Sequence, residues 1–163
     1  MGLAQQIRQV EYLTYSYDTI GNITSKSDVG SYAYPVSGAA SVRPHAVTTA
    51  GANSYLYDNN GNQTSGAGRT LEYTSYNLPK RIVKGSSDTS FQYDAEHVRH
   101  TQIIKTNGVE TERTVYINPR IDLGMTYEKV TKNGLTKHNH YVNIGSQRYL
   151  YTIEEGTGAG APK

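Results

Sequence analysis

The phrase Tyr-x-Tyr-Asp-x-x-Gly-Asn occurs twice in this chain, at Tyr15–Asn22 and, 40 residues later, at Tyr55–Asn62. A shortened copy, Phe91–His97, begins 36 residues after the second. Aromatic residues two positions apart lie on one face of a strand. Asp followed by Gly favours a turn, because the Asp side chain bonds nearby amides and Gly accepts positive φ. Each phrase therefore predicts a strand and the corner that ends it, and the chain is expected to be a β-repeat structure.

The phrases define a set of residues to which we assign structural roles. They are Tyr15, Tyr17, Asp18, Gly21 and Asn22 in the first copy, Tyr55, Tyr57, Asp58, Gly61 and Asn62 in the second, and Tyr93 and Asp94 in the third. The third copy has His97 where the turn Gly belongs, so its corner is either the same turn or a different one. A related unit at Tyr73–Ile82 replaces the Gly corner with a Pro corner, and we place the repeat units at Tyr17, Tyr34, Tyr57, Tyr76 and Tyr93.

Composition supports a thin β structure. Of 163 residues, 15 are Tyr, and only 36% are hydrophobic when those Tyr are included. Tyr favours strands whose faces are partly wet. So few apolar residues suit a shell or solenoid better than a compact domain.

Two Asn-Gly pairs, Asn107-Gly108 and Asn133-Gly134, separate β-rich segments. Asn-Gly is typical of the two-residue type I′ hairpin turn. The first turn would pair Lys105 with Glu110, and the second would pair Thr131 with Thr136 and Tyr127 with His140.

Charge and apolar content argue against several classes of partner. The net charge is +2 without a basic stripe, so we expect no nucleic-acid binding. No run approaches the roughly 20 apolar residues of a membrane span, so we expect no membrane insertion. The first residues lack the charged and apolar parts of a signal peptide.

No residue pattern indicates catalysis, a metal site or a cofactor. Asp58–Asn62 has its Gly at the fourth position rather than the sixth position of a calcium loop. His138 and His140 share a strand face but have no supporting carboxylate at ligand spacing. Cys is absent, and no Gly-x-Ser-x-Gly elbow occurs. We therefore predict a protein that is not an enzyme.

The ordered phrases resemble the YD repeats of the Rhs family, which also occur in insecticidal toxin complexes and teneurins. The matching residues are Tyr17–Thr24, Arg43–Val47, Tyr57–Thr64, Tyr76–Pro79 and Tyr93-Asp94, and the block from Tyr116 to Tyr141 is similar to the segment before the family's core region. The resemblance implies an all-β fold of consecutive antiparallel hairpins in a curved or spiral sheet. We expect this sheet to cover residues 1–155 and a flexible Gly/Ala-rich tail to follow at residues 156–163.

In the family, such sheets wind into a shell around a C-terminal toxin. The resemblance therefore implies a non-catalytic segment of a bacterial shell, secreted or at the cell surface in the parent protein. Its partners would be the remainder of that protein and the toxin cargo. The alternative is an adhesion or carbohydrate-binding module that uses the Tyr-rich face to bind a glycan. We also expect homo-oligomers through edge strands, since the phrases Tyr12–Asp18 and Tyr141–Tyr151 contain neither Lys nor Pro.

Overall fold

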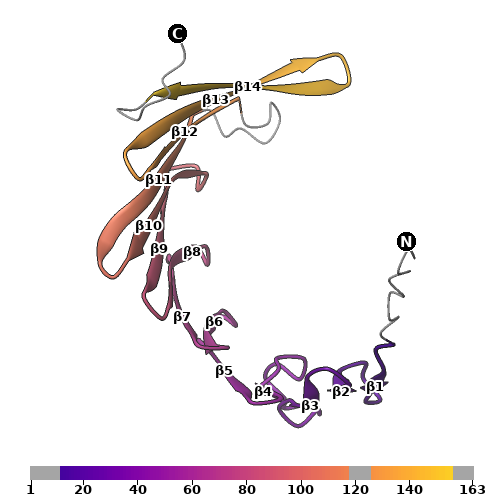
Figure 1. Cartoon of the computed structure of the whole chain (residues 1–163). Helices are drawn as coiled ribbons and strands as arrows, with labels where there is room; N and C mark the ends of the chain where they lie inside the picture. Colours follow the sequence, from indigo (N-terminus) through magenta and orange to yellow (C-terminus); the bar gives the residue numbers. More distant parts are fainter. Residues whose placement is uncertain (1–11, 118–125, 156–163) are drawn as a thin grey trace, which may run out of the picture. The chain divides into compact units, whose positions relative to one another are not determined.

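The computed structural model describes residues 12–117 and 126–155 (Figure 1). These residues form 14 strands and no helix, and the strands lie in one antiparallel sheet in the order of the sequence. The predicted class, an all-β chain of consecutive antiparallel hairpins, is confirmed. The tail at residues 156–163 lies outside the described residues.

The chain divides into two compact units, Met1–Ala67 and Gly68–Lys163. The strands of the first unit are β1 (Tyr15–Tyr17), β2 (Ile23–Lys26), β3 (Gly30–Ala33), β4 (Thr49–Ala50), β5 (Asn53–Tyr57) and β6 (Gln63–Gly66). These strands are short, and the longest has five residues.

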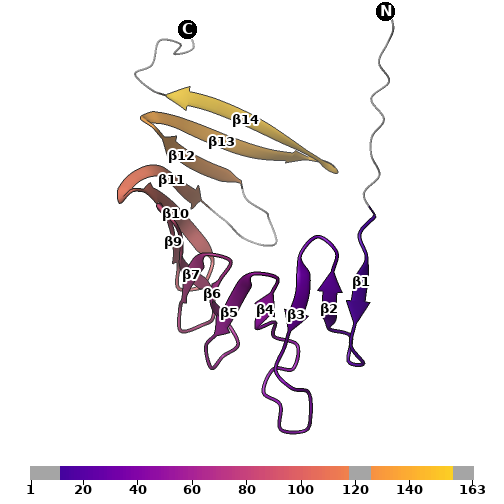
Figure 2. The ribbon, with the colours of Figure 1, turned by 60° about the horizontal axis from the view of Figure 1, so that its bottom comes forward.

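The second unit contains β7 (Arg69–Tyr73), β8 (Pro79–Lys84), β9 (Ser87–Tyr93), β10 (Arg99–Thr106), β11 (Val109–Ile117), β12 (Tyr127–Lys132), β13 (Leu135–Ile144) and β14 (Gln147–Glu155). Figure 2 shows β10 to β14 side by side in this order. These strands reach ten residues in β13.

Both Asn-Gly turns form as predicted. Asn107 and Gly108 have φ values of 52° and 79°, and Asn133 and Gly134 have 50° and 79°. Positive φ at both central residues defines the type I′ turn. The register pairs Lys105 with Glu110, Thr131 with Thr136 and Tyr127 with His140. Local turn chemistry therefore sets the pairs beside both turns. It sets the whole register of β12 and β13, whereas a shift between Ile104 and Lys105 changes the register in the rest of β10 and β11.

The sheet has almost no core. Among the described residues, Ala50 is the one buried hydrophobic residue, and no side chain is less than 2% exposed. Large apolar side chains remain open to solvent, such as Leu56, Val109 and Leu150. A sheet normally covers its apolar face with a second layer. Within each unit, the described strands form a single layer that no second layer covers.

Candidate functional site

The first phrase folds into a closed five-residue corner at residues 18–22. One Asp18 carboxylate oxygen accepts the amides of Ile20 (3.0 Å) and Asn22 (2.8 Å), and the other accepts the Asn22 side-chain amide (3.0 Å). The Asp18 amide donates to the Asn22 carbonyl at 2.9 Å, and Gly21 has φ +88°. The carboxylate is therefore used to hold the turn.

The second phrase repeats this geometry at residues 58–62. Asp58 accepts the amides of Asn60 and Asn62 and the Asn62 side chain, all at 2.9 Å. The bond from the Asn62 side chain is the main cause that lowers the pKa of Asp58. Desolvation opposes the shift at Asp18, but the hydrogen bonds from Asn22, Ile20 and Gly21 together outweigh it and lower the Asp18 pKa. The predicted turn roles of Asp18, Gly21, Asn22, Asp58, Gly61 and Asn62 agree with these contacts.

The third phrase forms the same corner as the first two, although His97 replaces the turn Gly. Asp94 accepts the amides of Glu96 (2.9 Å) and Val98 (2.8 Å), and His97 has φ +62°. His tolerates the left-handed conformation better than most residues. Position 98 is Val98 rather than Asn, so this corner lacks the side-chain bond that the first two contain.

A further corner begins at Thr74, and it corrects the predicted unit at Tyr76. The Leu78 amide donates to the Thr74 hydroxyl (3.1 Å), and Asn77 takes the positive φ of 63°. Pro79 lies after the corner and begins β8. The expected Pro corner is therefore wrong, because a Thr hydroxyl and a left-handed Asn replace the Asp and the Gly.

All of these corners have the same strand register. The aromatic residue before each corner pairs with the residue six positions later. The strand register shifts next to this pair in every case. The pairs are Tyr17 with Ile23, Tyr57 with Gln63, Tyr73 with Pro79, and Tyr93 with Arg99. This shared register identifies Tyr73, rather than Tyr76, as the repeat aromatic of its unit.

Side chains link neighbouring corners within the first unit. Asn22, buried to 7% exposure, donates to the Pro44 carbonyl (3.0 Å) and contacts His45 Nδ1 at 2.7 Å through its Oδ1. Since Asn22 Oδ1 is an acceptor, His45 Nδ1 must carry the proton. Arg43 donates to the Asp58 carbonyl, so residues 43–45 connect the first corner to the second. Residues 43–45 lie between the first two phrases in the sequence. No local pattern in the sequence predicts the contacts that they make with the two corners.

Two of the repeat Tyr residues anchor a corner to an earlier segment. The Tyr57 hydroxyl donates to the Val47 carbonyl (2.9 Å), and the Tyr93 hydroxyl donates to the Pro79 carbonyl (2.7 Å). Burial raises the pKa of both Tyr hydroxyls. Tyr15 and Tyr17 differ, because they are exposed and their rings stack 6.4 Å apart.

Two further contacts pack rings against corners or strands. The rings of Tyr76 and His97 stack at 3.8 Å with an interplanar angle of 10°, which joins two successive corners of the second unit. Tyr55 lies over Gly66, its partner in register, and a Cβ at Gly66 would come within 2.2 Å of the Tyr55 ring. The role of Gly66 was not predictable from the sequence, because no turn motif marks this residue.

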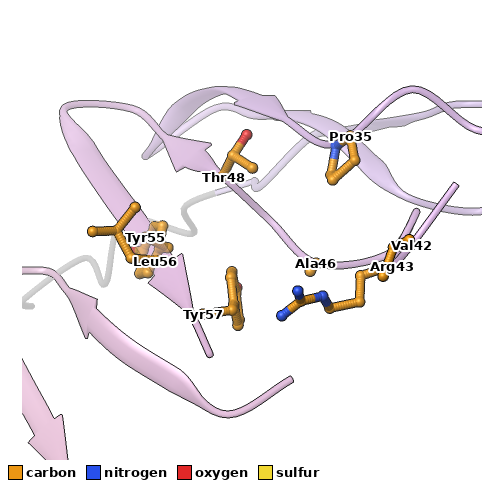
Figure 3. A pocket seen from close by; sticks show the side chains of 8 residues that line it. All are labelled: Pro35, Val42, Arg43, Ala46, Thr48, Tyr55, Leu56 and Tyr57. Carbon is orange, nitrogen blue, oxygen red and sulfur yellow. The ribbon is translucent and has the colours of Figure 1, made fainter. Parts of the chain in front are cut away.

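A cavity of about 320 Å³ lies beside the second corner (Figure 3). Its lining is mostly apolar and consists of Pro35, Val42, Arg43, Ala46, Thr48, Tyr55, Leu56 and Tyr57. Arg43 is the one charged residue in this lining, and its guanidinium already donates to the Asp58 carbonyl. The lining contains no acid, base or nucleophile in a catalytic arrangement.

His138 and His140, which share a strand face, contact Tyr and Glu side chains. His138 Nδ1 lies 2.6 Å from the Tyr127 hydroxyl, and its Nε2 lies 3.3 Å from a Glu155 carboxylate oxygen. The His140 ring packs edge-on against Tyr127 at 4.9 Å. No group of three His, Cys, Asp or Glu residues that could hold a metal occurs in the part of the chain that the structure describes.

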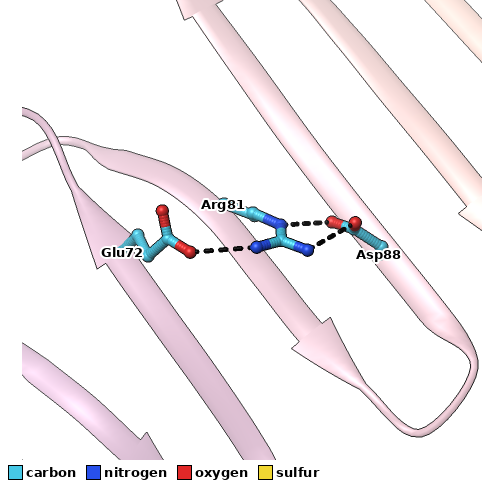
Figure 4. Close-up of polar contacts among 3 residues, drawn as sticks. All are labelled: Glu72, Arg81 and Asp88. Carbon is cyan, nitrogen blue, oxygen red and sulfur yellow. Dashed lines mark hydrogen bonds and ion pairs between the residues drawn. The ribbon is translucent and has the colours of Figure 1, made fainter.

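Arg81 in β8 bridges two neighbouring strands on an exposed face (Figure 4). It bonds Asp88 of β9 through two nitrogens at 3.0 and 2.9 Å, and Glu72 of β7 at 3.1 Å. The Asp88 bonds are the main cause that raises the Arg81 pKa, and the Arg81 guanidinium lowers the Asp88 pKa. Exposed ion pairs of this kind contribute little to stability.

No protein-family model and no curated protein matches this chain. Within residues 12–117 and 126–155, no helix is long and apolar enough to cross a membrane.

Proposed function

We propose that this chain is a non-catalytic structural segment of an Rhs/YD-repeat shell that encloses or presents a C-terminal toxin. The observation that carries the proposal is the uncovered single-layer sheet. Leu56 is 63% exposed and Val109 is 67% exposed, although both lie in regular strands. A sheet with no second layer over it leaves its apolar side chains for another body to cover. In a shell, the remaining wall and the cargo would cover it.

The repeated corners support a structural role. Their carboxylates accept bonds from their own turns, and the side chains of Asn22, Arg43, Tyr57 and Tyr93 link each corner to a neighbouring segment. Side chains bonded in this way hold successive hairpins in place, as nearest-neighbour contacts do in repeat proteins. Because these polar side chains are bonded within the fold, they favour a structural role in a shell wall over a catalytic role. The partners would then be the remainder of the parent protein and its toxin, at a bacterial surface or outside the cell.

A labelling experiment tests whether one face of the sheet is enclosed. Asn53 and Ser54 are exposed neighbours in β5, and adjacent strand residues point to opposite faces. The chain has no Cys, so Asn53→Cys and Ser54→Cys each introduce the single thiol of residues 1–163, and any Cys elsewhere in the full-length product is first replaced by Ser. In the full-length gene product, a bulky maleimide should label one position rapidly and the other only after unfolding.

The chain of residues 1–163 alone provides the control, because both positions are exposed in it and should react at similar rates. Equal rapid labelling of both thiols in the full-length product would contradict an enclosed face. A nuclease or hydrolase activity that is lost on changing His138 and His140 would contradict the non-catalytic assignment.

The alternative function, glycan binding, is favoured by the stacked pair Tyr15 and Tyr17. The two residues are 43% and 60% exposed, and their rings lie nearly parallel at 19°. Exposed Tyr rings provide rigid, amphipathic contact surfaces. A glycan array would show binding that Tyr17→Ala removes and that Tyr57→Phe, a change at the half-buried contact with the Val47 carbonyl, leaves intact. Absence of binding on the array would reject this alternative.

A further inference from the structure

Strand β14 exposes an edge that has no partner among the described residues. All nine of its residues, Gln147–Glu155, are exposed, and it pairs on one side with β13. It contains neither Pro nor Lys, the residues that commonly block edge pairing. Tyr151 is 63% exposed and Leu150 is 57% exposed. This edge is therefore long, apolar in part, and unprotected.

The turn before β14 determines which amides face outward. Gly145 and Ser146 form a two-residue turn, and Ile144 pairs with Gln147. The closing pair of such a hairpin exchanges hydrogen bonds, and bonded pairs alternate along an antiparallel ladder. Odd-numbered residues of β14 therefore bond β13. The outward amides and carbonyls belong to the even-numbered residues, which are Arg148, Leu150, Thr152 and Glu154.

We propose that a second copy of this chain pairs antiparallel with β14, with the two-fold axis at Tyr151. Tyr151 then faces Tyr151 of the partner subunit, and all nine residues of the strand find a partner. The other facing pairs are Leu150 with Thr152, Tyr149 with Ile153, Arg148 with Glu154, and Gln147 with Glu155. A two-fold interface of this kind closes on itself and forms a dimer.

Charge complementarity selects this register. Arg148 and Glu154 lie at equal distances from Tyr151, so each strand offers one charge of each sign to its copy. Shifting the axis to Leu150 places Arg148 opposite Thr152 and leaves Glu154 without Arg. Shifting it to Thr152 places Leu150 opposite Glu154, and a parallel in-register pair places Arg148 against itself. Opposite charges and aromatic or β-branched pairs directly across strands are favourable, whereas like charges are not.

Contacts within the chain hold both charges on the same face. The Arg148 guanidinium lies 4.4 Å from the Tyr141 ring centre, and Glu154 forms an ion pair with Lys137 at 2.5 Å. An Arg can stack on a ring and still donate hydrogen bonds from its edge. This proposal does not rest on the proposed function and concerns the chain of residues 1–163 by itself. In a continuous shell wall, the next strand of the parent protein would pair with β14 in place of the second copy.

Charge reversal tests both the dimer and its register. Arg148→Glu alone places Glu against Glu154 twice across the axis, and Glu154→Arg alone places Arg against Arg148 twice. Each single variant should raise the dimer dissociation constant by on the order of tenfold or more. An equimolar mixture should restore association as a heterodimer, because each facing pair then has opposite charges.

Analytical ultracentrifugation of the full chain, from low to high micromolar concentration, measures these constants. Lys84→Glu is the matched control, since Lys84 is exposed in β8 and the change alters net charge as Arg148→Glu does. The control should dimerise like the unmodified chain. A monomeric unmodified chain at high micromolar concentration would overturn the proposal. A mixture of the two single variants that fails to associate would overturn the register and, with it, the proposed interface.

Discussion

His97 tests whether ring stacking between corners compensates for a residue in the left-handed region. Its φ is +62°, and its ring stacks 3.8 Å from Tyr76. A stacked aromatic pair contributes about 0.5–1.5 kcal/mol beyond area burial, and an exposed pair lies at the lower end. His97→Ala removes the stack and keeps the left-handed backbone, so we expect a loss of about 0.5–1 kcal/mol. His97→Gly removes the stack but also relieves about 1 kcal/mol of backbone strain, so we expect almost no change.

A double-mutant cycle with Tyr76→Ala and His97→Ala isolates the contact. Urea unfolding, followed by circular dichroism because the chain has no Trp, gives the free energies of unfolding. We expect a coupling energy of about 0.5–1 kcal/mol. Glu96→Ala, at the adjacent exposed position of the same corner, should show no coupling with Tyr76→Ala. A coupling no larger than that of this control, or a His97→Gly variant less stable than His97→Ala, would refute the reasoning.

Three further perturbations test the corners and turns. A Cβ at Gly51 would lie 2.3 Å from the Val29 carbonyl oxygen, whereas one at Gly21 meets nothing within 4 Å. Gly21→Ala should therefore cost only about 1 kcal/mol of strain and Gly51→Ala about 1–3 kcal/mol more, and equal unfolding free energies would contradict this close contact. The Asp58 pKa lies below its ordinary value of 3.8, so its stabilising effect is complete above that value and is lost as pH falls through the folded pKa. Unfolding measured from pH 7 to pH 2 should show a steeper acid loss for the unmodified chain than for Asp58→Asn, and identical profiles would reject the assigned hydrogen bonds. Gly134→Val places a β-branched residue at φ +79° and should destabilise by about 1–3 kcal/mol, which an unchanged melting temperature would disprove.

Features determined by a few adjacent residues were predictable from the sequence. The Asn-Gly pairs predicted both the turn type and the facing residues nearest each turn, because a two-residue turn allows one register beside it. The shift between Ile104 and Lys105 has no signal in the turn, so the pairs farther along β10 and β11 were not predictable from it. The Asp18 and Asp58 corners were predictable because their contacts are local. Each carboxylate accepts hydrogen bonds from the amides two and four residues later.

Features that depend on substitution within the motif were harder to predict. Thr74 supplies a hydroxyl in place of the carboxylate, and Asn77 supplies the positive φ in place of Gly, so aromatic spacing alone placed that unit at Tyr76. The register shared by Tyr73 and the other repeat aromatics reveals the equivalence only in three dimensions.

Contacts between segments distant in sequence could not be predicted. The bond between Asn22 and His45 spans 23 residues, and the close approach of Tyr55 to Gly66 depends on the register of β5 and β6. No local pattern specifies which loop lies against which corner. The sequence therefore predicted the hairpins well, but it did not predict the side chains that join one hairpin to the next.

These joining contacts explain how a sheet with little core can hold its shape. Each unit buries few apolar side chains, so its order must depend on backbone ladders and on contacts between adjacent hairpins. Asn22 and Arg43 supply such contacts in the first unit, and Tyr93 and the Tyr76–His97 stack supply them in the second. None of these contacts needs a second layer, so both faces of the sheet stay available to other surfaces. The proposed role as a wall beside a cargo requires this property, since the stability of such a wall cannot depend on filling the space that the cargo occupies.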